Sequence, residues 1–330
     1  MSDIALPRRR PSYFSRLFEA YGQEIVVLGA IIVLFIVVGL VNPRFLSNTN
    51  LTSIFSGNAY IAVAAIGMAM VIISGHIDVS VGSLIGVLAT IAGTLAVSGY
   101  PIWVAWTVPV LAGIVINTCL GALIAYMRIP SIVATLGMLS ILKGGLISAT
   151  GGTWITGMPP GFFIAQGRLF GIPAPVYFMI TLTIIMALWM RYSATGRSIY
   201  AVGGNAEAAR ATGLDPERTC VLVFALHGFF AGIAALLFAT QLQVIQSTVP
   251  PNLELTVITA AVIGGVSILG GTGTVIGSTL AAILFACIGS ALIFLNVSAY
   301  WLRAVLGLLI LATVLADMAR RRRHRAGGRL

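Results

Sequence analysis

The stretch Val104–Tyr126, VAWTVPVLAGIVINTCLGALIAY, contains no charged residue. An α-helix needs about 20 consecutive apolar residues to cross the hydrocarbon core of a bilayer, so this stretch predicts a membrane-spanning helix. The rest of the chain has the same character: 58% of its 330 residues are apolar, 8% are charged, and the mean hydropathy is +1.03. Soluble domains carry charge on about a quarter of their residues. The composition therefore argues against a soluble enzyme or binding module and predicts an all-α, polytopic membrane protein.

Apolar stretches of this kind recur along the chain and predict about ten transmembrane helices. The ten predicted spans are Glu24–Val41, Asn58–Ile73, Val81–Val97, Val104–Tyr126, Ile132–Ala149, Pro173–Met190, Val221–Thr240, Leu255–Leu269, Val275–Leu295 and Tyr300–Ala316. The second, third and eighth are short for a hydrocarbon core about 30 Å thick. Gly and Ser, rather than dense charge, separate the segments. Short or broken helices around a polar cavity show this pattern.

The basic residues predict the orientation, because Lys and Arg accumulate in cytoplasmic loops. With the N-terminus inside and ten alternating spans, the residues that face the cytoplasm are Arg8, Arg9, Arg10, Arg16, Arg128, Arg191, Arg197, Arg210, Arg218, Arg320, Arg321, Arg322, Arg323, Arg325 and Arg329. Only Arg44 and Arg168 then face outside. We therefore expect both termini in the cytoplasm. Basic ends that flank an apolar body favour contact with anionic membrane lipid over binding of nucleic acid.

The predicted organisation is a basic cytoplasmic segment (1–23), one transmembrane domain (24–317) and an arginine-rich cytoplasmic tail (318–330). The longest hydrophilic cytoplasmic segment is 191–218, and it contains a helix signal. Asn205 is a good N-cap after a break at Gly203–Gly204, Glu207 falls in the first turn, and Gly213 ends the helix. So short a helix is unstable alone. It is either an ordinary surface turn or a docking element for a cytoplasmic partner.

Asp78, in the string SGHIDVSVGS, is the only acidic residue between Glu24 and Glu207. A carboxylate at membrane depth costs roughly 2.5–3.5 kcal/mol on insertion scales, so it faces a cavity or a partner. Asp78 could cap the following helix, line a polar passage or relay protons. For His227, a bond across a helix interface is favoured over a proton relay. The other candidates for a translocation pathway are Ser80, Ser83, Asn117, Thr135, Lys143 and Glu254.

Lys143 is the sole lysine, and two glycines follow it, so the chain has no phosphate-binding loop of the G-x-x-x-x-G-K-[ST] type. Its ammonium group either reaches to the outer interface or bonds a solute or a facing acid. Glu254 is expected at the outer mouth. We expect no metal, cofactor or catalytic residue on this chain, because no arrangement typical of a hydrolase or a metal site is present. The sequence therefore predicts a transport subunit rather than an enzyme.

Taken together, four blocks resemble the permease subunits of ribose-type bacterial ATP-binding-cassette (ABC) importers. They are SGHIDVSVGSLIG (Ser74–Gly86), NTCLGALIAYMRIPSIVATLGMLSILKG (Asn117–Gly144), TGRSIYAVGGNAEAARATGL (Thr195–Leu214) and AAVIGGVSILGGTGTVIGS (Ala260–Ser278). The resemblance implies a multi-pass permease of the inner membrane that imports a sugar or sugar-like solute. RIPSIVATLG (Arg128–Gly137) and GGTWI (Gly151–Ile155) are more similar to ribose, rhamnose or autoinducer-2 systems than to amino-acid permeases.

The resemblance also implies partners: a second permease copy or paralogue, a cytoplasmic ABC ATPase that holds ATP and Mg²⁺, and a periplasmic sugar-binding protein. It identifies the 195–214 block as the coupling helix that fits a groove on the ATPase. The residues that carry this role are Gly203, Gly204, Asn205, Glu207, Ala208, Ala209, Arg210 and Gly213. The family pattern usually has Gly in place of His76 and ELD in place of Glu254-Leu255-Thr256. The alternative is a secondary transporter driven by an ion gradient, with Asp78 and His227 as coupling groups.

Overall fold

The computed structural model describes residues 13–163, 166–241, 244–246, 252–298 and parts of 300–315, with side chains described from residue 22 onward. The predicted N-terminal segment is thus described only from residue 13, and the arginine-rich tail lies outside the described residues. The helices are α1 (Tyr13–Val41), α2 (Asn48–Gly57), α3 (Ala59–Ile73), α4 (Val81–Val97), α5 (Ile102–Met127), α6 (Ser131–Thr150), α7 (Ala174–Tyr192), α8 (Ala194–Gly204), α9 (Ala206–Ala211), α10 (Pro216–Ala239), α11 (Leu253–Ile263) and α12 (Val275–Phe294).

Within the described residues, seven stretches of helix are long and apolar enough to cross a membrane. They are Gly22–Val41, Asn48–Ile73, Ile102–Met127, Ser131–Thr150, Ala174–Tyr192, Pro216–Ala239 and Val275–Phe294. Two shorter apolar helices, α4 and α11, match the third and eighth predicted spans and are short as expected. The second predicted span joins α2 to form a longer stretch that is interrupted at Asn58. Only parts of the tenth predicted span are described.

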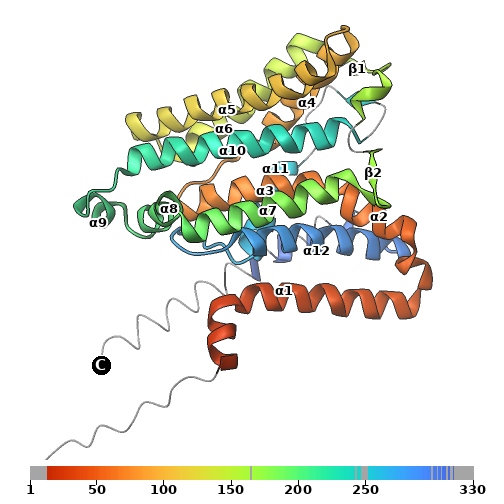
Figure 1. Ribbon diagram of the computed structural model, residues 1–330, viewed down its shortest axis with the longest axis horizontal. Helices are drawn as coiled ribbons and strands as arrows, with labels where there is room; N and C mark the ends of the chain where they lie inside the picture. Colours follow the sequence, from red (N-terminus) through yellow and green to blue (C-terminus); the bar gives the residue numbers. More distant parts are fainter. Residues whose placement is uncertain are drawn as a thin grey trace, which may run out of the picture.

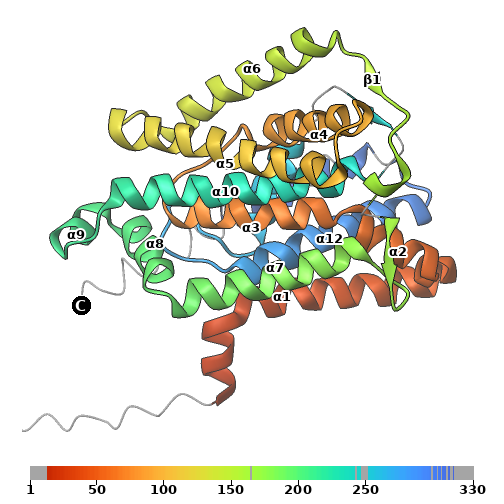
Figure 2. The same ribbon diagram turned by 45° about the horizontal axis from the view of Figure 1, so that its top comes forward.

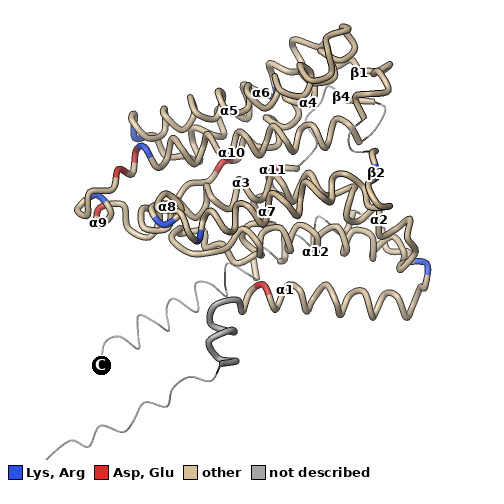
Figure 3. The backbone as a smooth tube through the Cα atoms, viewed as in Figure 1, with Lys and Arg blue, Asp and Glu red and all other residues tan. Residues whose placement is uncertain are grey.

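The long helices lie side by side, and each end of the bundle has its own structure (Figure 1). One end carries α8 and α9, and we call it the α8–α9 end. The opposite end carries short antiparallel pairs, β1 (Trp154–Ile155) with β4 (Ile245–Gln246) and β2 (Arg168–Leu169) with β3 (Ile172–Pro173). Charged residues gather near α8 and α9, whereas the helices between the two ends carry few (Figure 3).

Helix α3 forms the centre of the bundle, where α7, α10 and α12 lie around it (Figure 2) and α11 also packs against it. Every residue of α3 except Tyr60 is buried. A helix that is apolar all round requires such a position. At the periphery, only Thr135 and Leu146 of α6 are buried, and the rest of that helix faces outward or is half-buried.

Helices α5 and α10 pack closely through small residues. Gly228 and Gly232 of α10 are four residues apart, a spacing that allows two backbones to approach in lipid. A Cβ added at Gly228 would overlap the carbonyl oxygen of Gly113 in α5, and one at Gly232 would lie 2.6 Å from the Val110 Cα. The same contact continues at Gly121, where an added Cβ would lie 2.6 Å from the Phe224 Cβ. The close contact between α5 and α10 therefore requires glycine, which has no side chain, at these positions.

Two helices end in the same way and lead into loops that start another helix. Ser74 is the C-cap of α3 and is followed by Gly75 with φ +88°, and Gly264 is the C-cap of α11 and is followed by Gly265 with φ +97°. In each case the two N–H groups after the cap bond back to the last turn: Gly75 and His76 in one, Gly265 and Val266 in the other. The α3–α4 loop and the α11–α12 loop are thus local counterparts, in agreement with the similar strings VSVGSL (Val79–Leu84) and TVIGST (Thr274–Thr279).

Candidate functional site

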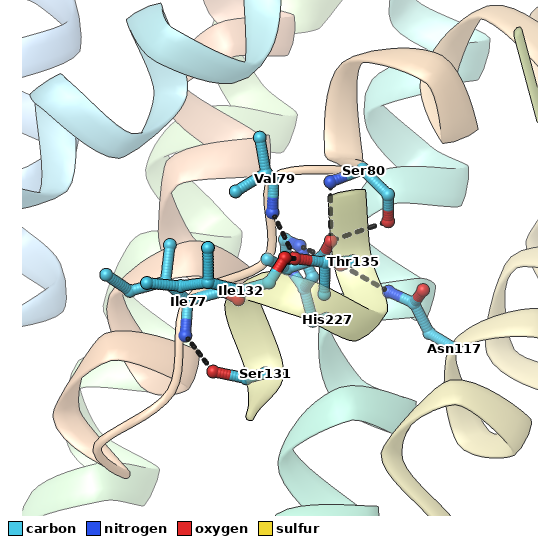
Figure 4. Close-up of polar contacts among 9 residues, drawn as sticks. Ile77, Val79, Ser80, Asn117, Ser131, Ile132, Thr135 and His227 are labelled. Carbon is cyan, nitrogen blue, oxygen red and sulfur yellow. Dashed lines mark hydrogen bonds and ion pairs between the residues drawn. The ribbon is translucent and has the colours of Figure 1, made fainter. Parts of the chain in front are cut away.

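A buried polar cluster lies where the extended segment between α3 and α4 turns into α4 (Figure 4). The Oδ1 atom of Asp78 accepts hydrogen bonds from the backbone N–H of Ser80 at 2.7 Å and from its hydroxyl at 2.5 Å. Ser80 is the N-cap of α4, and its own side chain makes no capping bond. Asp78 therefore fixes the start of α4, as the capping interpretation expected.

The second carboxylate oxygen of Asp78 faces two other helices. Its Oδ2 atom lies 3.4 Å from Nε2 of His227 in α10 and 3.5 Å from Nδ2 of Asn117 in α5. All three side chains are fully buried. The His227 ring fits because residue 67 of α3 is glycine: a Cβ there would lie 2.6 Å from Nδ1 of the ring. His227 thus contacts Asp78 across a helix interface.

Helix α6 supplies acceptors for the backbone of the extended segment. The hydroxyl of Ser131 accepts a hydrogen bond from the Ile77 N–H at 3.2 Å, and the hydroxyl of Thr135 accepts one from the Val79 N–H at 3.1 Å (Figure 4). In a membrane these N–H groups have no water to bond, and leaving each unpaired costs several kcal/mol. Ser131, which the sequence prediction did not include, therefore belongs to the cluster.

The cluster extends inward from Ser131, the first residue of α6, to Asn117 within α5. Asn117 is ten residues from the end of α5, or about 15 Å at 1.5 Å per residue. Glu254 lies close by, because its Oε2 packs against Gly82 in the first turn of α4 and an added Cβ at Gly82 would overlap it. Glu254 is half-buried there rather than at the outer mouth as the sequence predicted. The reason is that α11 starts at Leu253, beside the start of α4, and not at the end of the bundle.

Two other candidates for the translocation pathway, Ser83 and Lys143, lie outside the hydrogen-bonded cluster. The hydroxyl of Ser83 is buried and has no hydrogen-bond partner among the described residues. Lys143 is exposed on the outward face of α6, eight residues beyond Thr135. The structure therefore brings together Asp78, Ser80, Asn117 and Thr135, places Glu254 and Ser83 nearby, and leaves Lys143 apart.

The predicted helix in the segment 191–218 is present as α9. The Asn205 side chain accepts a hydrogen bond from the Ala208 N–H at 3.0 Å, Glu207 lies in the first turn, and Gly213 follows with φ +87°. The predicted break at Gly203–Gly204 is wrong, because these residues form the end of α8 and the chain breaks at Asn205 instead (φ −161°, ψ 103°). The sequence prediction did not include α8.

An ion pair fixes α9 against the start of α10. Arg210 of α9 bonds Glu217 of α10, and this contact raises the pKa of the guanidinium. Asp215 caps α10 by accepting a hydrogen bond from the Arg218 N–H at 2.9 Å, which lowers the pKa of its carboxyl. Ala209 is buried, whereas Ala208 and Glu207 are exposed. Helix α9 is thus held on one face and presents the other, with an acidic side chain, to the surroundings.

A cavity of about 420 Å³ lies between this segment and the α3–α4 loop. Its lining includes Ser74, His76, Asn205, Glu217 and Cys220. His76, where the family pattern has Gly, is bonded to the Ser74 hydroxyl at 3.2 Å and packs edge-on to the Phe224 ring. Among the described residues, no group of three or more His, Cys, Asp or Glu side chains could hold a metal ion.

Comparisons with known proteins give a consistent result. A family model described as "Branched-chain amino acid transport system / permease component" matches residues 50–314. The chain is 38% identical to the "Autoinducer 2 import system permease protein LsrC" of Salmonella typhi over 301 residues, which are 91% of this chain and 87% of that protein. The proteins of the same name from Escherichia coli O9:H4 and Shigella flexneri are 36% and 37% identical, with 91% of this chain and 88% of theirs covered. No solved structure gives a significant match.

Proposed function

The chain belongs to the family of transport-system permease components, which are multi-pass membrane subunits and not enzymes, and from this premise we propose that it imports a small sugar or sugar-like solute as the permease of an ABC importer. The proposed class of solute is supported by the sequence identity of 36–38% to autoinducer-2 import permeases over 91% of this chain. The family model is named for amino-acid systems, but the permeases matched along nearly the whole chain act in autoinducer-2 import.

The proposed topology has ten spans with both termini in the cytoplasm. The seven long helices, together with α4 and α11, account for nine predicted spans, and the residues 300–316 would add the tenth. The charges near α8 and α9 support a cytoplasmic position for that end of the bundle (Figure 3). The basic tail would follow on the same side and contact anionic lipid headgroups.

Energy for transport comes, in this proposal, from a separate ABC ATPase that binds ATP and Mg²⁺, while this chain holds no cofactor. The support is α9, whose position is fixed by the pair between Arg210 and Glu217 and whose exposed face carries Glu207. Family membership favours this interpretation over a gradient-driven secondary transporter. A substrate-binding protein outside the membrane would deliver the solute.

A second permease, either a copy or a paralogue, completes the proposed transporter. Helix α6 supports this proposal, because most of its side chains face outward and Lys143 lies well inside its length. A charged group in a membrane span usually faces a partner or a polar passage rather than lipid. The passage would then run along this face, near Lys143, and the buried cluster around Asp78 would stabilise the helices behind it.

Replacing Glu207 with arginine should weaken binding of the ATPase partner by roughly tenfold, or about 1.4 kcal/mol. The reason is that the substitution reverses the acidic charge on the exposed face of α9, while both side chains of the pair that fixes the helix, Arg210 and Glu217, stay in place. Binding is measured with the purified permease in nanodiscs and the purified ATPase. Arg44→Glu, an exposed charge reversal at the opposite end of the bundle, is the matched control and should bind normally. Equal affinity of both variants would contradict the docking role of α9.

A further inference from the structure

The end of α8 packs between the α3–α4 loop and the α11–α12 loop. A Cβ added at Gly203 would overlap the carbonyl oxygen of Ile73, at the end of α3, and would lie 2.9 Å from the Gly271 nitrogen in the α11–α12 loop. Across the same contact, an added Cβ at Gly271 would lie 2.6 Å from the Gly204 Cα. Three backbones thus meet here with no side chain between them, at Gly75, Gly203–Gly204 and Gly270–Gly271.

The two loops are also bonded to each other beneath α8. The N–H of Gly271 donates a hydrogen bond to the Ile73 carbonyl oxygen at 2.8 Å, the same oxygen against which Gly203 packs. Gly270 extends the contact, because a Cβ there would lie 2.7 Å from the Gly203 oxygen and 3.0 Å from the Gly75 Cα. Gly270 and Gly271 both have positive φ, at +81° and +75°. Neither loop can therefore shift at this point without moving the other.

Side chains of α8 hold the helix in this position. Ile199 is fully buried and Val202 is 4% exposed. The hydroxyl of Tyr200 donates a hydrogen bond to the Gly273 carbonyl oxygen at 2.9 Å, two residues beyond Gly271. Only Asn205 separates α8 from α9. A force on α9 therefore reaches the end of α8 through a short, well-packed connection.

Each loop leads directly into the start of another helix. The α3–α4 loop continues through Asp78 to the start of α4, and the α11–α12 loop leads to α12 through Thr274, whose side chain caps that helix. Interfaces packed this closely shift between discrete arrangements rather than deform continuously. A displacement at the glycine contact would therefore be passed to the polar cluster and to α12 together.

We propose that Gly203 is the joint that transmits motion of α9 to both loops at once, so that one cytoplasmic displacement moves the starts of α4 and α12 in concert. Gly203 is thus a positioning residue that acts through the Ile73 carbonyl and the Gly271 amide. The proposal rests on the proposed function, because it assumes that an ATPase drives α9. It adds the route from that helix into the membrane.

The test compares Gly203→Ala with Gly204→Ala in the complete transporter in vesicles. At Gly204 an added Cβ would meet only the Gly271 Cα, at 4.0 Å. The structure packs Gly203 against Ile73 and Gly271 rather than on the exposed face of α9, so we expect Gly203→Ala to bind the ATPase normally and to hydrolyse ATP, but to import at least tenfold less solute per ATP. Gly204→Ala should have a clearly smaller effect. Gly29→Ala is the control for the alanine substitution itself, because a Cβ added at Gly29 would have no neighbour within 4 Å outside its own stretch of helix.

Tyr200→Phe keeps the test decisive if Gly203→Ala does not fold, because it removes only the hydrogen bond to Gly273. It should lower solute import per ATP severalfold with ATPase binding intact. A normal ratio of solute import to ATP hydrolysis in Gly203→Ala would overturn the proposal that Gly203 transmits the motion. Where Gly203→Ala does not fold, a normal ratio in Tyr200→Phe would overturn it. Loss of ATPase binding in Glu207→Arg is a separate result, and its absence would count against the proposed function instead.

Discussion

Asp78→Ala is expected to lower the free energy of unfolding of the permease by about 3–5 kcal/mol, the range seen when one member of a buried pair is removed. Asp78 is fully buried, bonds both donors of Ser80 and faces His227 and Asn117. Without it, the start of α4 loses its acceptor, and His227 and Asn117 lose their common partner inside the bundle. Thermal unfolding in nanodiscs measures the change.

Two variants show whether this effect belongs to the cluster. Ser83→Ala, which removes a buried hydroxyl with no hydrogen-bond partner among the described residues, should change the stability little. The double variant Asp78→Ala/His227→Ala should lose less than the sum of the two single losses, because the residues contact each other. An Asp78→Ala protein that unfolds at the normal temperature but does not transport would contradict the anchoring role. It would assign Asp78 to the passage or to a proton relay.

Gly228→Val should separate α5 from α10 and destabilise the permease by about 1–3 kcal/mol or more, the usual cost of overfilling a packed contact. The clash is with the backbone carbonyl of Gly113, which cannot move aside as a side chain can. The substitution should also disturb the neighbouring His227, and with it the contact to Asp78. Thermal unfolding and the yield of folded protein after membrane extraction are the measurements.

The control for this prediction is Gly29→Val in α1. It makes the same change within a transmembrane helix, at a position where an added Cβ would have no neighbour within 4 Å outside its own stretch of helix. Any loss from the helix propensity of valine appears in both variants, so the difference between them reports the clash alone. Equal stability of the two variants would show that α5 and α10 do not depend on close backbone contact at Gly228.

The sequence predicted those features that depend on residues close together in the chain. Asn205, Glu207 and Gly213 define α9 by local capping rules, and the structure confirms this helix. The short apolar helices α4 and α11 were also predicted, because the length of an apolar run is visible in the sequence. The helix α8 was missed because its residues include Gly196, Gly203 and Gly204, which reduce helix propensity. Packing against Ile73 and Gly271 overrides that preference.

Contacts between distant segments could not be predicted in the same way. Nothing near Asp78 in the chain shows that Asn117, Thr135 and His227 meet it or its neighbours, because they come from three other helices. Glu254 was misplaced for a related reason: the depth at which α11 begins is decided by its contact with Gly82. A signal for Ser131 was present, since it starts α6 directly after Pro130, but its acceptor role depends on the position of Ile77.

Uptake of a labelled autoinducer-2-type sugar into sealed vesicles tests whether a partner ATPase drives transport through this permease. We expect uptake when the permease is reconstituted with its ATPase, its binding protein and ATP, and none when ATP hydrolysis is blocked. The permease alone should take up no sugar under an imposed proton or sodium gradient. Uptake driven by such a gradient, without the ATPase, would rule out ATPase-driven transport and establish the secondary transporter.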